Sequence, residues 1–190
     1  MRVTGGEFRS RRLKTLPGMS LRPTPDRLRE TLFDVLTPRI EGVTFADLYA
    51  GSGAAGIEAL SRGAARAIFV EKNRAAVEVI RENLRSLGIT QRARVICGKA
   101  VPVLRRLAAD IVFLDPPYDL ESEYEQALRA LGEAPPPLVI AQHTIRLALK
   151  EEYGRLRRVR LLKQGDNALS FYEAQPGSSS RNDSAPTIST

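Results

Sequence analysis

The sequence predicts an α/β fold, in which helices cover both faces of a mostly parallel sheet of seven strands. Two observations predict this fold. From residue 43 onward, short apolar segments alternate with segments that have the apolar period of an amphipathic helix. A glycine-rich loop also separates the first apolar segment from the helix that follows it, as at the ligand-binding edge of parallel sheets. With 190 residues, the chain is long enough to bury the core of one such sheet.

Expected strands and helices alternate in chain order. The strands are expected at residues 43–50, 67–71, 93–97, 110–114, 138–142, 156–162 and 168–172. The helices are expected at residues 25–36, from the glycine loop to about residue 63, and at 73–87, 101–108, 121–131 and 145–153. Thr24 and Pro25 mark the start of the first helix, and Asn73 and Gly88 flank the third. A turn at Gly165 joins the last two strands in a hairpin, which is expected to place one antiparallel strand at the edge of the sheet.

The chain is expected to divide into three parts. Residues 1–40 form a basic extension made of a hairpin around Gly5 and Gly6 and the first helix, and residues 41–174 form the sheet domain. Residues 175–190 are rich in serine and lack an apolar period, so we expect this tail to be disordered.

Composition excludes several classes of protein. Cys97 is the only cysteine and His143 the only histidine, which excludes an intrachain disulfide and a metal site built from several such residues. No apolar run approaches the roughly 18 residues that a membrane-spanning helix needs. Residues 1–20 carry charges throughout and lack the apolar segment of a secretory signal. We therefore expect a soluble, cytoplasmic protein that binds neither a metal nor a membrane. Nothing in the sequence indicates an oligomer, and a monomer is the default expectation.

Positive charge is concentrated near the N-terminus. The net charge is +7, and residues 1–29 hold eight basic and two acidic side chains, which leaves most of the excess in this segment. Such a basic segment is typical of proteins that bind a polyanion, although a merely solvated basic surface has the same composition. The side chains expected to bind a polynucleotide are Arg9, Arg11, Arg12, Lys14, Arg22, Thr24 and Arg27. A second basic run at residues 155–160 is expected to be the solvated face of an edge strand.

The glycine loop predicts a site for a cofactor that contains adenosine. Residues 51–56 fit the pattern G-x-G-x-x-G between a strand and a helix, and Glu71 follows Gly51 by 20 residues at the end of the next strand. Such glycines allow a tight turn and a close backbone approach, while the carboxylate accepts hydrogen bonds from a ribose diol. A dinucleotide and S-adenosylmethionine both fit this geometry.

Asp47 favours S-adenosylmethionine over a dinucleotide. A carboxylate four residues before Gly51 would repel a pyrophosphate, whereas it would attract a sulfonium or ammonium cation. In addition, 40 or so residues precede the first strand, whereas a dinucleotide-binding domain usually begins with it. The expected cofactor-binding residues are Asp47, Tyr49, Gly51, Ser52, Gly53, Gly56, Glu71, Lys72, Gly98 and Lys99.

The segment Asp115-Pro116-Pro117-Tyr118 predicts a site for an amino group. It follows a strand, at the end where ligands of open α/β sheets bind, and its prolines leave nearby carbonyls available as acceptors. Such a site suits methylation of an exocyclic amine on a nucleobase. The Asp115 carboxylate and the Pro116 carbonyl would accept hydrogen bonds from the two N–H groups of this amine, so that its lone pair faces the methyl group of S-adenosylmethionine. Tyr118 would stack on the base. The residues expected at the reacting centre are Asp115, Pro116, Pro117 and Tyr118.

These motifs resemble those of class I, S-adenosylmethionine-dependent N-methyltransferases, which have a Rossmann-like fold. Three longer segments closely resemble the RsmD family, which methylates N2 of a guanine in 16S ribosomal RNA: residues 5–13, 22–30 and 48–64. The resemblance covers about residues 2–173. It implies S-adenosylmethionine as methyl donor, S-adenosylhomocysteine as product, and a target guanine in an assembled or nearly assembled small ribosomal subunit.

Two positions depart from the family pattern. The loop after the third strand reads Cys97-Gly98-Lys99-Ala100, without the acidic residue that usually contacts the adenine amine. In the fifth strand, Ala141-Gln142-His143 stands where the family often has a glutamate, and we assign His143 no role.

Three other functions fit parts of the pattern. A DNA amino-methyltransferase also carries a DPPY segment, but it usually needs a separate target-recognition domain. A non-catalytic RNA-binding protein on the same scaffold would bind RNA without the cofactor. A nicotinamide-dependent dehydrogenase would share the glycine loop, although the chain offers no obvious proton donor.

Overall fold

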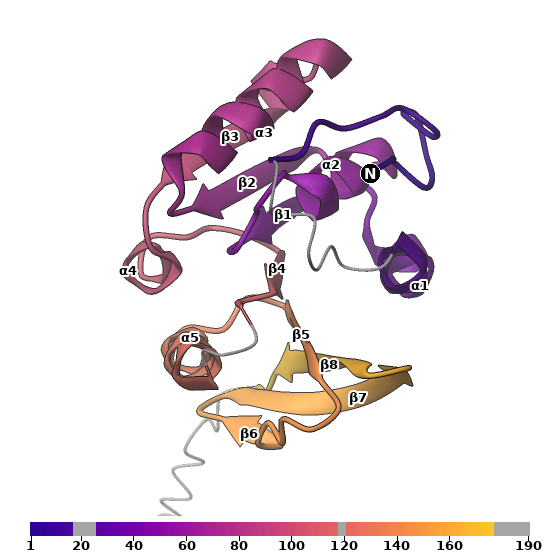
Figure 1. Cartoon of the computed structure of the whole chain (residues 1–190). Helices are drawn as coiled ribbons and strands as arrows, with labels where there is room; N and C mark the ends of the chain where they lie inside the picture. The colour runs from indigo at the N-terminus through magenta and orange to yellow at the C-terminus, as the bar shows by residue number, and fades with distance from the viewer. Residues whose placement is uncertain (17–25, 118–120, 177–190) are drawn as a thin grey trace, which may run out of the picture.

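The computed structural model describes residues 1–16, 26–117 and 121–176, which form a single eight-stranded sheet flanked by helices (Figure 1). The strand order is β3-β2-β1-β4-β5-β8-β7-β6. Neighbouring strands from β3 to β5 are parallel, whereas β8 is antiparallel to both β5 and β7. The strands are β1 (Thr44–Asp47), β2 (Arg66–Glu71), β3 (Ala93–Cys97), β4 (Ile111–Leu114), β5 (Leu138–Thr144), β6 (Glu152–Tyr153), β7 (Leu156–Gln164) and β8 (Asn167–Ala174).

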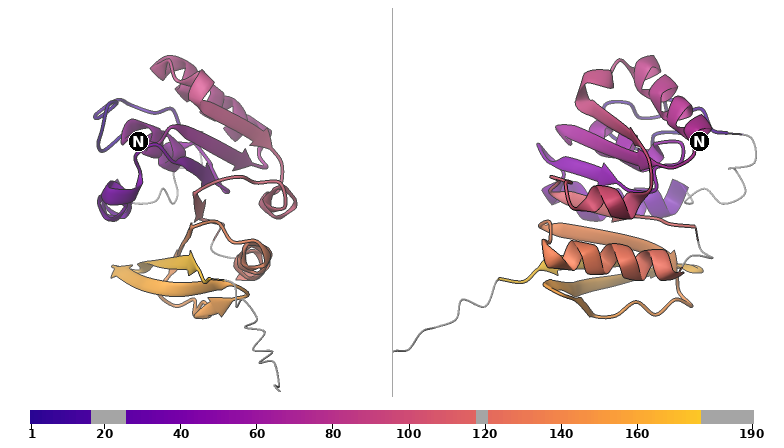
Figure 2. Two further views of the ribbon diagram at one scale, coloured as in Figure 1. Left: turned by 180° about the vertical axis from the view of Figure 1, so that it is seen from behind. Right: turned by 90° about the vertical axis from the view of Figure 1, so that its left-hand side faces the viewer.

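The described residues form five α-helices, which cover the two faces of the sheet. They are α1 (Asp26–Leu36), α2 (Ala54–Ser61), α3 (Arg74–Leu87), α4 (Ala100–Leu104) and α5 (Glu121–Glu133), and short 3₁₀ turns follow α1 and α3. The cores place α1, α2 and α3 on one face and α4 and α5 on the other. Figures 1 and 2 show α4 and α5 together on the face opposite α1. The predicted mostly parallel α/β architecture is thereby confirmed.

The local signals of α3 give the helix that they predict. Asn73 is its N-cap, and the Asn73 Oδ1 atom accepts hydrogen bonds from the backbone N–H groups of Ala75 and Ala76 at 2.9 and 3.4 Å. Gly88 ends the helix with a left-handed backbone. Val77, Ile80 and Leu84 are buried on one face against the sheet. Capping and apolar period therefore agree on the same helix.

The C-terminal half of the sheet differs from the prediction in three respects. The antiparallel strand β8 is not at the edge, because it pairs with β5 on one side and β7 on the other. Residues 145–153 are not a helix, and their last two residues form β6, which makes eight strands instead of seven. Leu149 reaches the core from irregular chain and Tyr153 from β6, so their burial does not require a helical face.

The N-terminal arm, which we define as residues 1–16, folds back on itself with one antiparallel bridge, between Arg2 and Arg12. It is less regular than the predicted hairpin, because its turn bonds to α2: the backbone N–H of Glu7 donates to the Ser61 carbonyl at 2.7 Å. A Cβ atom on Gly6 would lie 1.8 Å from that carbonyl oxygen, so only glycine allows this approach. Val3 and Phe8 enter the core beside α2 and α3. The arm is therefore part of the folded body.

The tail predicted to be disordered lies, from residue 177 onward, outside the described residues. No helix among the residues that the structure describes is long and apolar enough to cross a membrane.

Candidate functional site

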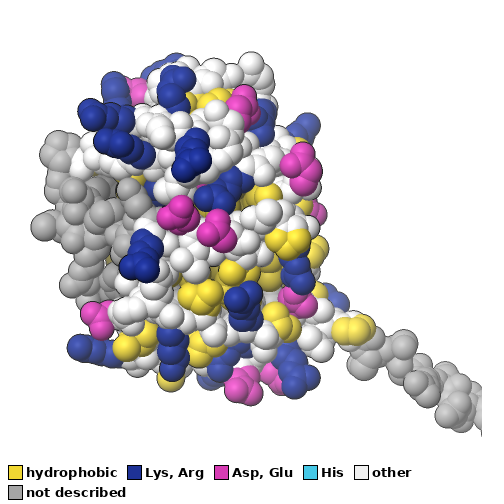
Figure 3. Space-filling view, turned by 90° about the vertical axis from the view of Figure 1, so that its right-hand side faces the viewer, with side chains coloured by type: hydrophobic (Ala, Val, Ile, Leu, Met, Phe, Trp, Pro, Cys, Tyr) yellow, Lys and Arg dark blue, Asp and Glu magenta, His cyan; other side chains and the backbone are white. Residues whose placement is uncertain are grey.

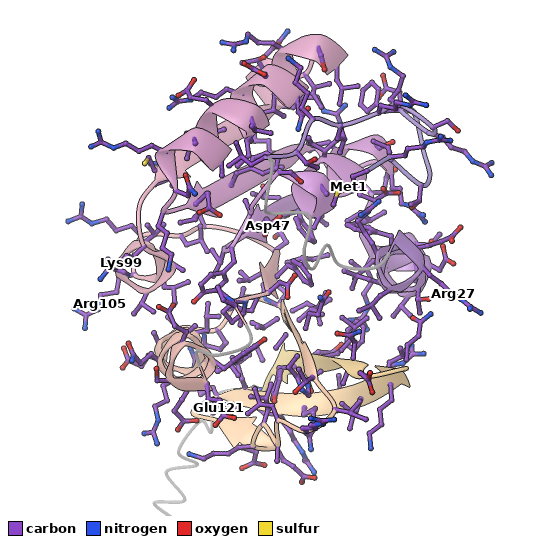
Figure 4. All side chains as sticks on the ribbon, in the orientation of Figure 1. Met1, Arg27, Asp47, Lys99, Arg105 and Glu121 are labelled. Carbon is purple, nitrogen blue, oxygen red and sulfur yellow. The ribbon has the colours of Figure 1, made fainter. Side chains whose placement is uncertain are left out.

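Three carboxylates meet at one edge of the sheet. Asp47 ends β1, Glu71 ends β2, and Asp115 follows β4 directly. Because β2, β1 and β4 are neighbouring parallel strands, their carboxyl ends lie side by side. In Figure 4, Asp47 lies in the middle of the molecule, between the two helical layers. The sequence predicted Asp47 and Glu71 from the glycine-loop motif and Asp115 from the DPPY segment. The structure places all three at the same end of the sheet.

The glycine loop is held to β2 by Glu71. The Glu71 carboxylate accepts hydrogen bonds from the backbone N–H groups of Gly51, at 2.9 Å, and of Asn73, at 2.8 Å. Gly51 and Gly53 turn the chain into α2 with positive φ angles of 54° and 83°. A carboxylate oxygen can accept more than one hydrogen bond, so Glu71 can hold the loop and still accept from a ribose hydroxyl.

Gly56 lets α2 pack closely on β2. A Cβ atom at this position would lie 2.3 Å from Cε1 of Phe69, which is fully buried on β2. The helix therefore approaches the strand more closely than any larger residue would allow. This approach sets the position of the loop above the carboxyl ends of the strands.

Asp47 is a buried acid with a strongly raised pKa. It is 2% exposed, and its Oδ1 atom has no hydrogen-bond partner among the described residues. Burial first, and then the negative charges of Asp115 and Glu71, raise the pKa of Asp47 to about 7, against the lowering effect of two backbone N–H groups. A buried acid with an unsatisfied oxygen and acidic neighbours fits a cationic ligand. The sulfonium and ammonium groups of S-adenosylmethionine meet this requirement.

The affinity for S-adenosylmethionine is expected to depend on pH through Asp47. A bound cation favours the ionised carboxylate, so the affinity should rise by nearly tenfold per pH unit below pH 7 and level off above it. The ligand-free protein should show the opposite trend in stability, because a pKa raised above the unfolded value of 3.8 makes folding less favourable as the pH rises toward 7. Isothermal titration calorimetry between about pH 5.5 and 8 measures the first effect.

Asp47→Asn tests this assignment against Asp110→Asn, a matched change at the amino end of β4. Asp47→Asn should weaken binding and remove the pH dependence, whereas Asp110→Asn should retain both affinity and pH dependence. Persistence of the pH dependence in Asp47→Asn would assign it to another group.

Other predicted cofactor residues surround this edge. The Tyr49 hydroxyl donates to Glu123 Oε2 at 2.7 Å, and burial together with Glu123 raises the pKa of Tyr49. Ser52 is buried in the glycine loop, and the Gly98 N–H donates to the Glu71 carbonyl at 2.9 Å. Lys72 and Lys99 are exposed at the ends of the neighbouring loops. Whether these side chains contact the cofactor stays a prediction.

Asn83 connects the glycine loop to the arm, which the sequence analysis did not predict. It is 1% exposed on α3, and its Nδ2 atom donates to the carbonyls of Ser52, at 3.0 Å, and Lys14, at 3.1 Å. Its Oδ1 atom accepts from the Lys14 N–H at 2.8 Å. An asparagine on the apolar face of a helix, three residues after Ile80, was the available signal.

The DPPY segment lies at the end of β4, with Asp115 half-buried, Pro116 buried and Pro117 exposed. Tyr118 lies outside the described residues. The Tyr124 hydroxyl, another residue that the sequence analysis did not single out, donates to the Gln142 carbonyl at 2.6 Å and lies 3.5 Å from the Pro116 carbonyl. The much shorter distance assigns its proton to Gln142, so the Pro116 carbonyl can accept a hydrogen bond from a ligand.

Both ring nitrogens of His143 have hydrogen-bond partners within the protein. Its Nδ1 atom lies 2.8 Å from the Thr144 carbonyl, and its Nε2 atom lies 2.9 Å from the Ser170 hydroxyl. A carbonyl only accepts, so Nδ1 carries the proton of a neutral ring. Burial lowers the pKa of His143, in agreement with the neutral form. Within residues 1–16, 26–117 and 121–176, no group of three His, Cys, Asp or Glu residues is placed to hold a metal ion.

Five of the seven residues predicted to bind RNA are described by the structure, and they lie on the outside of the arm and α1. The exposed ones are Arg9, Arg11, Arg12, Lys14 and Arg27, while Arg22 and Thr24 lie outside the described residues. Figure 3 shows Lys and Arg side chains grouped on the upper part of this face, and Figure 4 shows Arg27 pointing away from the body. Arg29 is different: its side chain is 2% exposed and lies 3.5 Å from Glu58, so it adds no charge to this surface.

Comparisons with known proteins agree with the motifs. A family model described as conserved hypothetical protein 95 matches residues 1–173. YlbH of Bacillus subtilis is 34% identical over 182 residues, which cover 91% of the chain and 98% of YlbH. Ribosomal RNA small subunit methyltransferase D of Escherichia coli K12 is 43% identical over 120 residues, which cover 62% of the chain and 60% of that protein. The solved structure of YhhF from Escherichia coli has a TM-score of 0.82 at 31% identity, covering 92% of this chain and 98% of that one. The chain belongs to the family of this model, which is the RsmD family.

Proposed function

We propose that the protein transfers a methyl group from S-adenosylmethionine to the exocyclic N2 of a guanine in 16S ribosomal RNA. The observation that carries this proposal is the meeting of Asp47, Glu71 and Asp115 at the carboxyl ends of three adjacent parallel strands. Methylation of small-subunit ribosomal RNA is the activity named in the Escherichia coli relative, and it supports RNA as the substrate.

The chain would hold the cofactor through Glu71, the glycine loop and Asp47. Glu71 would accept hydrogen bonds from the ribose, and the loop would lie under the sugar and methionine parts. When bound, S-adenosylmethionine supplies an electrophilic methyl group on a positively charged sulfur. Asp47 is buried beside Asp115 and Glu71, so it attracts that charge strongly and helps to orient the methyl group toward Asp115.

Asp115 and Pro116 would orient the guanine amine. Its lone pair is delocalised into the ring, which makes it a weak nucleophile. Hydrogen bonds from its two N–H groups, to the Asp115 carboxylate and the Pro116 carbonyl, would favour a pyramidal nitrogen with its lone pair directed at the methyl group. The nitrogen–carbon bond would form as the carbon–sulfur bond breaks, which leaves S-adenosylhomocysteine, and the surplus proton on nitrogen would pass to the Asp115 carboxylate and from there to water. Tyr118 would hold the base by stacking. The rate then depends mainly on positioning for in-line transfer, and the target base must leave its stack to reach the site.

The arm and α1 would hold the RNA, as a basic extension over residues 1–40 attached to a catalytic domain over residues 41–174. Arg9, Arg11 and Arg12 are exposed on the arm, which Asn83 connects to the glycine loop. We propose that the protein acts in the cytoplasm as a monomer without a metal ion, on a small subunit that is assembled or nearly so.

Arg11→Ala combined with Arg12→Ala should weaken RNA binding without changing the affinity for S-adenosylmethionine. Each lost phosphate contact reduces the slope of log Kd against log salt by roughly 0.7–0.9. Fluorescence anisotropy with labelled RNA at several salt concentrations measures this slope. An unchanged slope would remove the arm from the RNA interface.

Methyl transfer from tritiated S-adenosylmethionine tests the proposed function. Unmethylated small subunits, naked ribosomal RNA, transfer RNA and duplex DNA are compared as acceptors. The proposal predicts label in ribosomal RNA or small subunits and none in DNA. Label in DNA would favour a DNA amino-methyltransferase, and RNA binding without cofactor binding would favour a non-catalytic RNA-binding protein.

A further inference from the structure

A second basic surface lies at the amino ends of the parallel strands, opposite the carboxyl ends where Asp47, Glu71 and Asp115 lie. A groove with a volume of about 860 Å³ opens at the amino ends of β1, β2 and β3, beside the end of α4. Because β2 rises by about 3.3 Å per residue, its amino end at Arg66 lies roughly 17 Å from Glu71. The groove is therefore separate from the predicted cofactor site.

Arginine provides all the formal charge along this groove. Among the residues that the structure describes, the lining contains no acidic residue and five arginines: Arg66, Arg92, Arg94, Arg105 and Arg106. Asp110, which directly precedes β4, is outside the lining, and its carboxylate accepts a hydrogen bond from the Thr44 N–H at 2.8 Å. The net charge of the lining is thus strongly positive.

Arg92 differs from the other four arginines, because its guanidinium is bonded to the protein itself. The Arg92 guanidinium donates to the carbonyls of Leu60 and Ala64 at 2.9 and 2.7 Å and lies 3.4 Å from Glu7. The remaining four are exposed. In the described part of the chain, none of them has a carboxylate within 4.0 Å. Figure 4 shows Arg105 directed away from the body of the protein.

We propose that this arginine groove binds the sugar-phosphate backbone of the RNA substrate at a second contact, remote from the reacting amine. Planar guanidinium groups pair with phosphate oxygens through two parallel hydrogen bonds, and four of them around one groove suit several successive phosphates. Ile68, Ile96 and Val103 give the groove an apolar wall against which a ribose or base can lie. The proposal rests on the proposed function, because it takes RNA as the substrate.

This contact would act together with the arm. The arm packs beside α2 and α3 on one face of the sheet, whereas the groove opens beside α4 on the other. RNA that touches both surfaces would be held on two sides of the molecule. A large, structured substrate such as a ribosomal subunit can provide two such segments.

The test compares two triple variants that each remove three exposed positive charges. The groove variant is Arg94→Ala with Arg105→Ala and Arg106→Ala, and the control is Arg155→Ala with Arg157→Ala and Lys163→Ala. The control residues lie on or beside β7, and β3 and β7 are far apart in the strand order. Binding of a fluorescein-labelled single-stranded RNA is measured between about 50 and 200 mM salt. Affinity for S-adenosylmethionine and methyl transfer to unmethylated small subunits are measured alongside.

The groove variant should bind RNA at least about tenfold more weakly than the control, and its salt slope should be smaller by about two. Its KM for small subunits should rise with little change in kcat, and both variants should bind S-adenosylmethionine like the parent protein. Equal RNA affinities and slopes in the two variants would overturn the proposal. Absence of methyl transfer to RNA by the parent protein would refute the proposed function instead, and the binding comparison would still decide whether the groove contacts RNA.

Discussion

Asp115→Ala is expected to reduce methyl transfer to small-subunit ribosomal RNA by roughly 10²–10³-fold while the protein still binds S-adenosylmethionine. The carboxylate lies half-buried beyond β4, where its hydrogen bond to the amine would be strongest as positive charge develops on nitrogen. Losing one charge-assisted hydrogen bond in the transition state costs about 3–4 kcal/mol, which corresponds to this rate effect. Single-turnover methyl transfer with saturating cofactor measures it.

Asp110→Ala is the matched control, because Asp110 precedes the same strand at its other end. It should leave single-turnover transfer nearly unchanged. Asp115→Ala carries a second signature: the charge of Asp115 helps to raise the pKa of Asp47, so its removal should shift the pH dependence of cofactor binding to lower pH. Normal transfer by Asp115→Ala would remove this residue from the reacting centre.

Glu58→Gln is expected to give the largest loss of stability. Glu58 is fully buried, and its carboxylate accepts hydrogen bonds from the Thr4 N–H, the Thr4 hydroxyl, the Gly5 N–H and Arg62 Nε at 2.7–2.9 Å. Arg29 is buried beside it. Removing one charge from such a group costs about 3–5 kcal/mol, because the opposite charges stay buried. The melting temperature should fall by roughly 10 °C.

Glu78→Gln is the control for this change. Glu78 pairs with Arg81 on the solvent side of α3, and exposed pairs of this kind contribute little. Glu58→Gln should in addition release the arm, since Glu58 bonds to its backbone, so limited proteolysis should cut near residue 5 and RNA affinity should fall. A melting temperature equal to that of Glu78→Gln would show that this cluster does not hold the arm.

The local features of the fold could be predicted from the sequence because their signals are local. Asn73 and Gly88 bound α3 as expected, and the segment at residues 93–97 is β3 as predicted. The position of β8 between β5 and β7 could not be read in this way, because strand order depends on pairings between residues distant in the chain. The helix predicted at residues 145–153 was wrong for a related reason: irregular chain also buries apolar side chains, such as that of Leu149, so an apolar residue does not by itself indicate a helix.

The acidic part of the candidate site could be predicted because parallel strands place their carboxyl ends at a common edge. The residues that support the site could not, since their partners come from other parts of the chain: Tyr124 reaches Gln142, and Asn83 reaches Ser52. A charge count from the sequence also overestimates the positive charge of the surface, as Arg29 shows. It was one of the basic residues of the N-terminal segment, yet it is buried against Glu58.

The measurement that tests the central claim most directly is the identity of the methylated nucleoside. Small subunits labelled by the protein with tritiated S-adenosylmethionine are digested to nucleosides, which are separated by chromatography and identified by mass spectrometry. The account predicts that the label co-elutes with N2-methylguanosine, from a single position of 16S ribosomal RNA, and that it is lost with Asp115→Ala. Label in any other nucleoside, or N2-methylguanosine formed equally well by Asp115→Ala, would contradict it.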